Sequence, residues 1–312
     1  MNKTSQNSVF VADIGATYTR IGIGKKGRLV HVTTFRSGDQ ERFLQACKDA
    51  FAEHRPNNAI IAAAGPCADG RIHLTNLGWV VDAKQIRRRL GLGVVKVAND
   101  IETMACAIPF LLSRDVKNVY APTSRLEGPI SVVAAGTGLG RASLIGSRII
   151  PSEAGHTHAP CVTSDEYSLC RFIQHKRKLC LLSYEDILSG RGVSDVYHFV
   201  SGHRASAEEI GTMKKTLETQ KTWEIIQTYY ARFCQDTALE TLCYGGLYIA
   251  GGLASHNPHL FDKRFVRLFR THDTMQHVLA RIPVRFITHP YPGLIGAMHM
   301  WNVRRNVIKH FE

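Results

Sequence analysis

Two stretches of this chain share an order of residues that constrains its fold more than any other feature. The first reads VFVADIGATYTRIGIG from residue 9 to 24, and the second reads VVAAGTGLGRASLIGS from residue 132 to 147. Each has an apolar strand, a turn of small residues carrying a threonine, an arginine, and a second apolar strand that closes at a glycine. This weak repeat, about 120 residues apart, predicts two related lobes, each offering the backbone of a hairpin to one ligand.

The glycines of the second turn indicate what that ligand is. Backbone N–H groups converge on the oxygens of a polyphosphate only where Cβ atoms are absent. The turn Gly136-Thr137-Gly138 meets this need, and the Thr137 hydroxyl adds a donor. A plain tight hairpin carries the same glycines and stays open as the alternative. Gly251 and Gly252, after a short apolar strand, are equally typical of a simple strand-to-helix turn.

Two acidic residues stand at the ends of apolar strands. Asp13 comes just before Gly15, where its carboxylate would hold Mg²⁺ through water, because this ion keeps several waters and uses few carboxylates. A turn-stabilising aspartate is the alternative. Asn99 and Asp100 end a strand and open a helix, a pattern that often marks an N-cap. A carboxylate at Asp100 can also accept a proton from a hydroxyl during phosphoryl transfer, and one residue can do both.

Composition and cysteine usage place the chain among intracellular proteins with sizeable cores. With 312 residues, 44% hydrophobic and 21% charged, we expect two domains. No stretch approaches the roughly 18 apolar residues that a membrane span needs, and MNKTSQNS at the N-terminus lacks the pattern of a secretory signal. The eight cysteines show neither a CxxC pair nor zinc spacing. We therefore expect a cytoplasmic protein without membrane association, with reduced and mostly buried thiols.

The formal net charge of +13 raises the question of nucleic-acid binding. The densest basic runs, at 87–89, 175–178 and 304–305, lie far apart in the sequence and have few aromatic residues between them. Solvated faces explain such runs, and the same positive field would attract a small anionic substrate. The composition therefore favours a small-molecule ligand and no nucleic-acid partner.

The rest of the chain alternates strands with helices. In the first half we expect strands at 8–15, 18–24, 29–35, 58–64 and 94–98, and helices after Asp39, at 82–90 and at 101–112. Asp39 is the expected N-cap of the first helix, and Gly91 ends the second. In the second half we expect strands at 129–135, up to 145 and at 246–250, with helices near 165–178, 184–200 and 206–242.

The spacing of these motifs resembles that of bacterial glucokinases of the hexokinase-like, non-zinc branch, within the actin-like ATPase superfamily. The matching stretches follow the family's order across nearly the whole chain. They are DIGATYTR (13–20), LTNLGW (74–79), AND (98–100), GTGLG (136–140), SEAGH (152–156), YEDILSGRGVSDVY (184–197), GGLYIAGG (245–252) and PGLIGAMH (292–299). Each stretch is weak alone, and together they are specific.

The resemblance implies a fold, an activity and a set of site residues. The fold is α/β, a two-lobed actin-like ATPase (ribonuclease H-like) fold with an interlobe cleft. Its small α/β domain comprises residues 1–107 plus 293–312, and its large α+β domain comprises 108–292. The activity is phosphorylation of glucose at the 6-hydroxyl by ATP with Mg²⁺, in a homodimer. The implied glucose site is Asn99, Asp100, Glu153, His156 and Glu185, with Asp100 as the general base. ATP would bind at Asp13, Gly15, Thr17, Gly136, Thr137, Gly138, Gly251 and Gly252, with Asp13 on the Mg²⁺ through water.

Taken without the resemblance, several of these residues have ordinary structural explanations. Glu153 is then a solvated loop acid, His156 a core histidine with satisfied hydrogen bonds, and Glu185 an acid in the first turn of a helix.

The chain departs from the family's pattern at two turns. The family reads DxGGTN at the first hairpin, whereas this chain has Ala16 and Tyr18 in place of the second glycine and the asparagine. A Cβ at that point opposes close approach of a phosphate to the backbone. Arg141 replaces a small apolar residue after GTGLG and is expected to add a cation beside the phosphate turn. These departures keep a catalytically impaired sugar sensor open as an alternative function, with a basic nucleic-acid-binding protein as a weaker one.

Overall fold

The computed structural model describes residues 8–74 and 77–308 of the chain. Contacts divide it into two compact units, the first with residues up to 113, 144–150 and from 289 onward, and the second with 114–143 and 151–288. The sequence-based division into 1–107 plus 293–312 and 108–292 differs from these units by the segment 144–150 and by a few residues at each boundary. It stays a prediction.

Three sequence-based expectations extend beyond the described residues. The motif LTNLGW includes residues 75 and 76, the segment MNKTSQNS includes residues 1–7, and the expected small domain includes 309–312. All of these residues lie outside the described part of the chain.

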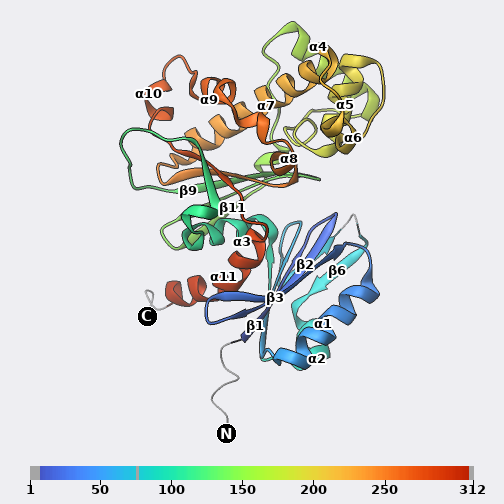
Figure 1. The fold of residues 1–312 in the computed structure, drawn as a ribbon, viewed down its shortest axis with the longest axis vertical. Coiled ribbons are helices and arrows are strands. Elements are labelled where there is room, and N and C mark those ends of the chain that lie inside the picture. Colours follow the sequence, from blue (N-terminus) through green and yellow to red (C-terminus); the bar gives the residue numbers. More distant parts are fainter. Residues whose placement is uncertain (1–7, 75–76, 309–312) are drawn as a thin grey trace. The chain divides into compact units, whose positions relative to one another are not determined.

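The first unit is built on a five-stranded sheet with the order β3-β2-β1-β4-β7 (Figure 1). The strands β1, β2 and β3 form an antiparallel meander, whereas β1, β4 and β7 run parallel. A separate antiparallel pair, β5 and β6, completes the strands. The elements are β1 (Ser8–Ile14), β2 (Tyr18–Lys25), β3 (Arg28–Arg36), α1 (Gln40–His54), β4 (Asn58–Ala63), β5 (Arg71–Leu74), β6 (Trp79–Asp82), α2 (Ala83–Leu90), β7 (Val94–Asn99), α3 (Asp100–Ala107) and α11 (Pro292–Ile308).

Helices cover both faces of this sheet because successive residues of its central strand alternate between two apolar cores. Phe10 and Ala12 pack with residues of α1 and α2 in one core. Val11 points to the other face and packs with residues of α3 and α11, among them Cys106 and Leu294. Figure 1 shows α1 and α2 on one side of the strands and α3 and α11 on the other. Such burial on both faces accounts for the continuous apolar run of β1.

The second unit is built on a six-stranded sheet with the order β11-β10-β9-β12-β13-β8, although residues 144–150, at the end of β10 and in β11, are grouped with the first unit. The strands β9, β12 and β13 run parallel, and β8 is antiparallel to β13. One core joins the sheet to helices of this unit, with Tyr229, Tyr230 and Phe233 of α7 fully buried. The elements are β8 (Val116–Tyr120), β9 (Ile130–Ala135), β10 (Leu139–Ile145), β11 (Arg148–Ser152), α4 (Ser164–Arg177), α5 (Gly190–Ser201), α6 (Ala207–Thr212), α7 (Leu217–Thr241), β12 (Gly246–Ala250), α8 (Gly252–His256), α9 (Lys263–Arg270), α10 (Gln276–Leu279) and β13 (Val284–Ile287).

The two sheets repeat one topology. The order β3-β2-β1-β4-β7 of the five-stranded sheet has its counterpart in β11-β10-β9-β12-β13 of the six-stranded sheet. The hairpin β1–β2 contains the stretch 9–24, and the hairpin β9–β10 contains the stretch 132–147. The repeat expected from the sequence is therefore confirmed as a repeat of strand order.

The helix expectations were wrong at three points, each with a local cause. The helix expected at 101–112 ends at Ala107, because Pro109 lacks an N–H and disfavours helical backbone before it. The helix expected at 184–200 begins only at Gly190, where the Ser189 side chain caps it by accepting from the N–H of Gly192. The stretch 206–242 is two helices, α6 and α7, because Thr216 starts a new helix with its own capping box.

The cysteines differ from expectation at one pair. Cys161 and Cys170 form a disulfide, because the loop before α4 lies beside the helix and brings the two sulfurs together. The other six cysteines carry thiols, of which four are buried and those of Cys67 and Cys180 are exposed. Within residues 8–74 and 77–308, no helix combines the length and apolar character needed to cross a membrane.

Candidate functional site

In the first unit, the register of the sheet places Asp13 and Asn99 at one edge. Ile14 pairs with Ala63 across β1 and β4, and Ala63 pairs with Asn99 across β4 and β7. The carboxyl ends of parallel strands meet at the same edge of a sheet, which is where ligands bind in open α/β sheets. The strands β1 and β7, which carry Asp13 and Asn99, are therefore separated by β4 alone, and their carboxyl ends lie at the same edge of the sheet.

Asp13 is buried at this edge in a setting that disfavours its charge. Burial raises the pKa of Asp13 to about 6, and the Arg20 guanidinium, 3.7 Å from Oδ2, offsets part of that rise. The start of α11 approaches closely, since a Cβ added at Gly293 would lie 2.6 Å from Oδ2 of Asp13. The motif PGLIGAMH thus has a local reason for its first glycine, which the sequence alone did not reveal. A cation beside Asp13 would stabilise its carboxylate.

The turn after Asp13 is held by its own backbone and by the residue that follows β3. The N–H of Gly15 donates to the carbonyl of Tyr18 at 3.1 Å. The hydroxyl of Ser37 donates to the carbonyl of Gly15 at 2.6 Å, and the N–H of Ser37 donates to the carbonyl of Thr17 at 3.0 Å. Ser37 therefore fixes the turn that carries Ala16, a role that no sequence motif indicated.

Asn99 and Asp100 have different structural roles at the start of α3. The Asn99 Oδ1 accepts from the N–H groups of Ile101 and Glu102, so Asn99 is the N-cap, and its Nδ2 donates to the carbonyl of Gly65 at 3.0 Å. Asp100 is the first residue of the helix and is half-buried, with Oδ1 accepting from the N–H of Ile101 at 2.9 Å. The capping interpretation thus applies to Asn99, while Asp100 stays at the strand edge.

In the second unit, the two glycine turns lie against each other. The N–H of Gly136 donates to the carbonyl of Gly138 at 2.8 Å, which closes the turn containing Thr137. A Cβ at Gly136 would lie 3.7 Å from the backbone nitrogen of Gly252. Gly251 has a φ of 92° and caps α8. The residues predicted to hold phosphates and adenosine in this unit are therefore brought together.

Glu185 lies directly on the turn between β9 and β10. Its Oε2 accepts a hydrogen bond from the N–H of Leu139 at 2.9 Å, and a Cβ at Gly138 would lie 2.7 Å from that oxygen. A Cβ at residue 138 would collide with the Glu185 carboxylate, so this position needs a glycine whether or not a phosphate binds there. Because α5 begins at Gly190, Glu185 is not an acid in the first turn of a helix, and that structural explanation is wrong.

The segment carrying Glu153 and His156 joins the same turn. The N–H of Glu185 donates to the carbonyl of Gly155 at 2.9 Å, and a Cβ at Gly155 would lie 2.0 Å from the carbonyl oxygen of Leu139. The side chains of Glu153 and His156 are exposed, with His156 Nε2 3.8 Å from Glu153 Oε2. His156 is therefore not a core histidine. The structure brings Glu153, His156 and Glu185 together within this unit.

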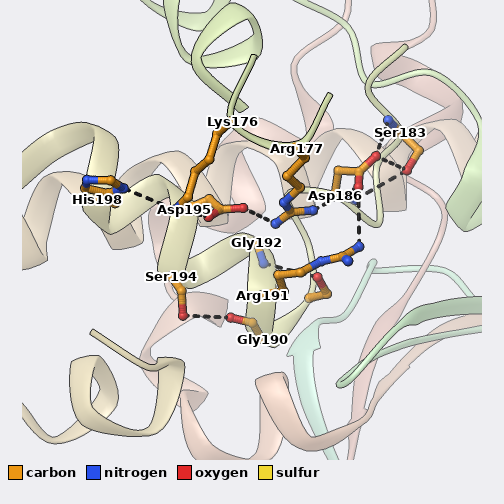
Figure 2. Close-up of polar contacts among 11 residues, drawn as sticks. Lys176, Arg177, Ser183, Asp186, Gly190, Arg191, Gly192, Ser194, Asp195 and His198 are labelled. Atoms are coloured by element: carbon orange, nitrogen blue, oxygen red, sulfur yellow. Dashed lines mark hydrogen bonds and ion pairs between the residues drawn. The ribbon is translucent and has the colours of Figure 1, made fainter. Parts of the chain in front are cut away.

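A network of charged residues holds the segment of Glu185 in place (Figure 2). Asp186, the next residue, accepts from Arg177 at 2.9 Å and from both the N–H and the hydroxyl of Ser183. Arg177 also pairs with the buried Asp195, which Lys176 contacts at 2.6 Å. The run 175–178 was expected to be a solvated face. That expectation was wrong for Lys176 and Arg177, because both reach inward to acids of the neighbouring segments.

Arg141 does not add a cation to the phosphate turn. Its guanidinium forms an ion pair with Glu240 of α7, and the arginine side chain is largely buried. The expected role is thus corrected, because the charge of Arg141 is neutralised between β10 and α7.

Comparisons with known proteins place the chain among sugar kinases. A family model described as Glucokinase matches residues 10–303. A glucokinase of Colwellia psychrerythraea is 32% identical over 311 residues, covering 92% of this chain and 94% of that protein. The crystal structure of a glucokinase from an Antarctic psychrotroph has a TM-score of 0.80 at 25% identity, covering 95% of this chain and 99% of that one. A glucokinase from Balamuthia mandrillaris, in complex with glucose, has a TM-score of 0.81 at 21% identity and covers 98% of this chain and 95% of that one. These similarities confirm the predicted α/β fold class of actin-like ATPases.

Proposed function

This chain belongs to the glucokinase family, and from this premise we propose how it transfers the terminal phosphoryl group of ATP to the 6-hydroxyl of glucose. Asp100 is the general base. The hydroxyls of glucose are bound by Asn99, Asp100, Glu153, His156 and Glu185. The observation that carries the proposal is the junction at Leu139, where Glu185 and the segment of Glu153 and His156 meet the glycine turn.

The chemistry of the proposed base follows from its position. The 6-hydroxyl loses its proton as the phosphoryl group moves, and a carboxylate within hydrogen-bond reach accepts that proton. Asp100 sits at the edge of the sheet where β7 ends, and the cap supplied by Asn99 holds the start of its helix. A rigid helix start keeps the carboxylate in one orientation.

Recognition of glucose relies on acceptors. Sugar hydroxyls donate hydrogen bonds to carboxylates, and an imidazole nitrogen adds a donor or an acceptor. The exposed side chains of Glu153 and His156 are accessible to a ligand, and the Glu185 carboxylate has a second oxygen besides the one bonded to Leu139. A hexose lacking one of these hydroxyls would leave an acceptor unpaired and bind less well.

The nucleotide is assigned to the two glycine turns. We assign the phosphates to Asp13, Gly15 and Thr17 of the first hairpin and to Gly136, Thr137 and Gly138 of the second, with Gly251 and Gly252 beside the adenosine. Asp13 fits Mg²⁺ held through water. Burial raises the pKa of this carboxyl group, and a nearby cation would stabilise its ionised form. Bound there, the ion would neutralise charge on the phosphates.

A phosphorylation assay across hexoses and phosphoryl donors tests the proposal. We expect turnover with glucose and ATP, and little turnover when ADP or polyphosphate replaces ATP. Glucose binding without turnover would favour the second candidate, an impaired sugar sensor, for which Ala16 and Tyr18 are the specific observation. Absence of glucose binding in a folded protein would contradict both functions.

Three further assignments rest on the resemblance to the family and on composition. We propose a homodimer, located in the cytoplasm and without a nucleic-acid partner. Light scattering on the purified chain tests the dimer, and salt-dependent DNA binding would contradict the last assignment.

A further inference from the structure

A cluster of two histidines and one glutamate lies in the first unit, outside the residues assigned to glucose and ATP. His31 belongs to β3, and Glu53 and His54 end α1. Each offers one ligand atom, and the three atoms lie within 4.8 Å of one another. Ser8, at the opposite end of β1 from Asp13, donates to the carbonyl of His54 at 3.5 Å. The cluster is therefore separate from the sheet edge that carries Asp13 and Asn99.

The spacing within the cluster suits a metal ion. The Glu53 Oε2 lies 3.5 Å from His31 Nδ1, and Oε1 lies 3.4 Å from His54 Nε2. Zinc binds imidazole and carboxylate at about 2.0–2.2 Å in tetrahedral geometry, which places its ligand atoms about 3.4 Å apart. Each imidazole nitrogen thus lies at about this spacing from one of the two carboxylate oxygens of Glu53.

His54 supplies an independent sign that a ligand is missing. Its Nε2 is buried and makes no hydrogen bond to the described residues, although it faces the Glu53 carboxylate. A buried nitrogen without a hydrogen bond costs about 1–3 kcal/mol, so natural structures rarely retain one without a reason. Coordination of a cation by the Nε2 lone pair would remove that cost.

The backbone around the cluster agrees with a cation site. His31 has a φ of 54°, a strained conformation for a residue with a Cβ, at an irregularity of the β2–β3 pairing. His54 is the last residue of α1, and the C-terminal end of a helix favours positive charge. The strain in β3 thus falls on a residue that lies beside this helix end.

We propose that His31, Glu53 and His54 bind a divalent transition metal, zinc foremost, with three protein ligands and a fourth position open to water. Two imidazoles and one carboxylate suit zinc and disfavour Mg²⁺ and Ca²⁺, which prefer all-oxygen sites. Bound there, the ion ties the last turn of α1 to β3. Zinc would therefore stabilise the folded chain against unfolding.

Metal titration of the chelator-treated full chain, without nucleotide, tests the proposal. Zn²⁺ binding is measured by calorimetry, and Co²⁺ is used as a spectroscopic probe because its tetrahedral complexes absorb visible light strongly. We expect a zinc site whose affinity falls at least about 100-fold in His31→Gln, Glu53→Gln and His54→Gln, more than loss of a second-shell partner costs. We also expect zinc to raise the unfolding midpoint of the wild-type chain but not of these variants.

The matched control is His73→Gln, which removes an exposed histidine of β5 in the same unit. This variant keeps the site and its cobalt spectrum if the proposal holds. Glu53 has a side chain 62% exposed, so Glu53→Gln remains a test even where a histidine variant fails to fold. Equal zinc affinity in wild type and Glu53→Gln would overturn the proposal, as would a Co²⁺ complex without tetrahedral absorption.

Discussion

The carboxylate of Glu185 accepts a hydrogen bond from the backbone N–H of Leu139, 2.9 Å away, at the end of the glycine turn between β9 and β10. This bond connects a residue assigned to glucose with the turn assigned to the phosphates of ATP, inside one unit. The turn therefore depends on Glu185 for one of its backbone hydrogen bonds. Substitutions at residue 185 report on both ligands.

Replacement of Glu185 by glutamine separates binding from catalysis. The amide oxygen of the new side chain still accepts from Leu139, so the turn keeps its shape, but the charge that strengthens bonds from sugar hydroxyls is lost. We expect the KM for glucose to rise about tenfold or more with a smaller fall in kcat, measured by coupled assay. An unchanged KM would mean that Glu185 supports the turn but does not bind glucose.

Arg177 positions that segment from behind and provides a second prediction. Arg177→Met leaves Asp186 and the buried Asp195 without their shared partner, which should cost roughly 3 kcal/mol in the free energy of unfolding. We expect a raised KM for glucose in the variant that folds, with kcat less affected. Arg177→Lys should restore stability only in part, because an ammonium lacks the planar fork.

Arg191 is the control for this network. It lies 3.7 Å from the same carboxylate of Asp186, but its side chain is 67% exposed. Exposed ion pairs contribute about 0–1 kcal/mol, so Arg191→Met should unfold close to wild type in urea. A loss as large as that of Arg177→Met would mean that Asp186, rather than the buried pair, sets the stability.

Asp100→Asn tests the assignment of the base. The amide still hydrogen-bonds a hydroxyl but cannot accept its proton, so we expect glucose binding to persist and kcat to fall at least about 100-fold. Glu102→Gln is the matched control, since Glu102 lies in the same first turn of α3 and shares the helix dipole. Near-normal turnover in a folded Asp100→Asn chain would show that Asp100 is not the general base.

The parts of the fold that could be predicted are those whose signals are local. The strands of the first hairpin agree with the sequence expectation to within one residue, because apolar runs bounded by glycine and lysine turns leave few alternatives. The helix α2 agrees as well, since Asp82 caps its start and Gly91, with a φ of 63°, ends it. Caps and turns act over a few residues, so a sequence can display them in full.

The parts that could not be predicted depend on distant partners. Tyr184, Ile187 and Leu188 have helical spacing and are buried, yet the bonds from Ser183 and Arg177 to Asp186 hold that segment in a turn. The strand β13, with four residues, pairs with β8 and β12 and carries too short a pattern to recognise. In the same way, no local pattern relates His31 to Glu53 and His54, because the sheet and α1 bring them together.

Asp13 makes stability depend on pH in a direction opposite to that of most carboxylates. Its pKa is raised from 3.8 to about 6, so between these values the folded state binds more protons than the unfolded chain, and stability falls as pH rises. Above pH 6 the whole cost is present, about 3 kcal/mol. Asp13→Asn should therefore be more stable than wild type at pH 8 by up to that amount, with the difference vanishing near pH 4.

Urea unfolding at both pH values, with and without Mg²⁺ and ATP, measures this difference. Magnesium with ATP should stabilise the wild type more than Asp13→Asn, because the variant lacks the carboxylate proposed to hold the ion but keeps the other residues assigned to the nucleotide. Asp49→Asn removes an exposed carboxylate of α1 and should show neither effect. Equal stability of wild type and Asp13→Asn at pH 8 would contradict the raised pKa.

The first hairpin carries the last prediction. Ala16 places a methyl group where close approach of backbone to phosphate requires a bare position, in a turn that Ser37 holds in shape. Ala16→Gly should tighten ATP binding several-fold, on the order of 1 kcal/mol, and leave glucose affinity unchanged. The added backbone freedom should cost about 0.5–1 kcal/mol of stability, so nucleotide affinity and unfolding must be measured on the same samples.

Variants of Arg141 test whether the tighter ATP binding expected for Ala16→Gly arises from the first hairpin alone. Because its guanidinium pairs with Glu240, Arg141→Ala should lower stability and leave the dissociation constant of ATP close to that of wild type. The double variant with Ala16→Gly should then bind ATP as tightly as Ala16→Gly does, since independent sites add. Weaker ATP binding in Arg141→Ala, after correction for unfolded protein, would restore a nucleotide role to this arginine. Unchanged ATP affinity in Ala16→Gly would mean that the phosphates do not approach the backbone at residue 16, and that the alanine is tolerated because nothing needs its space.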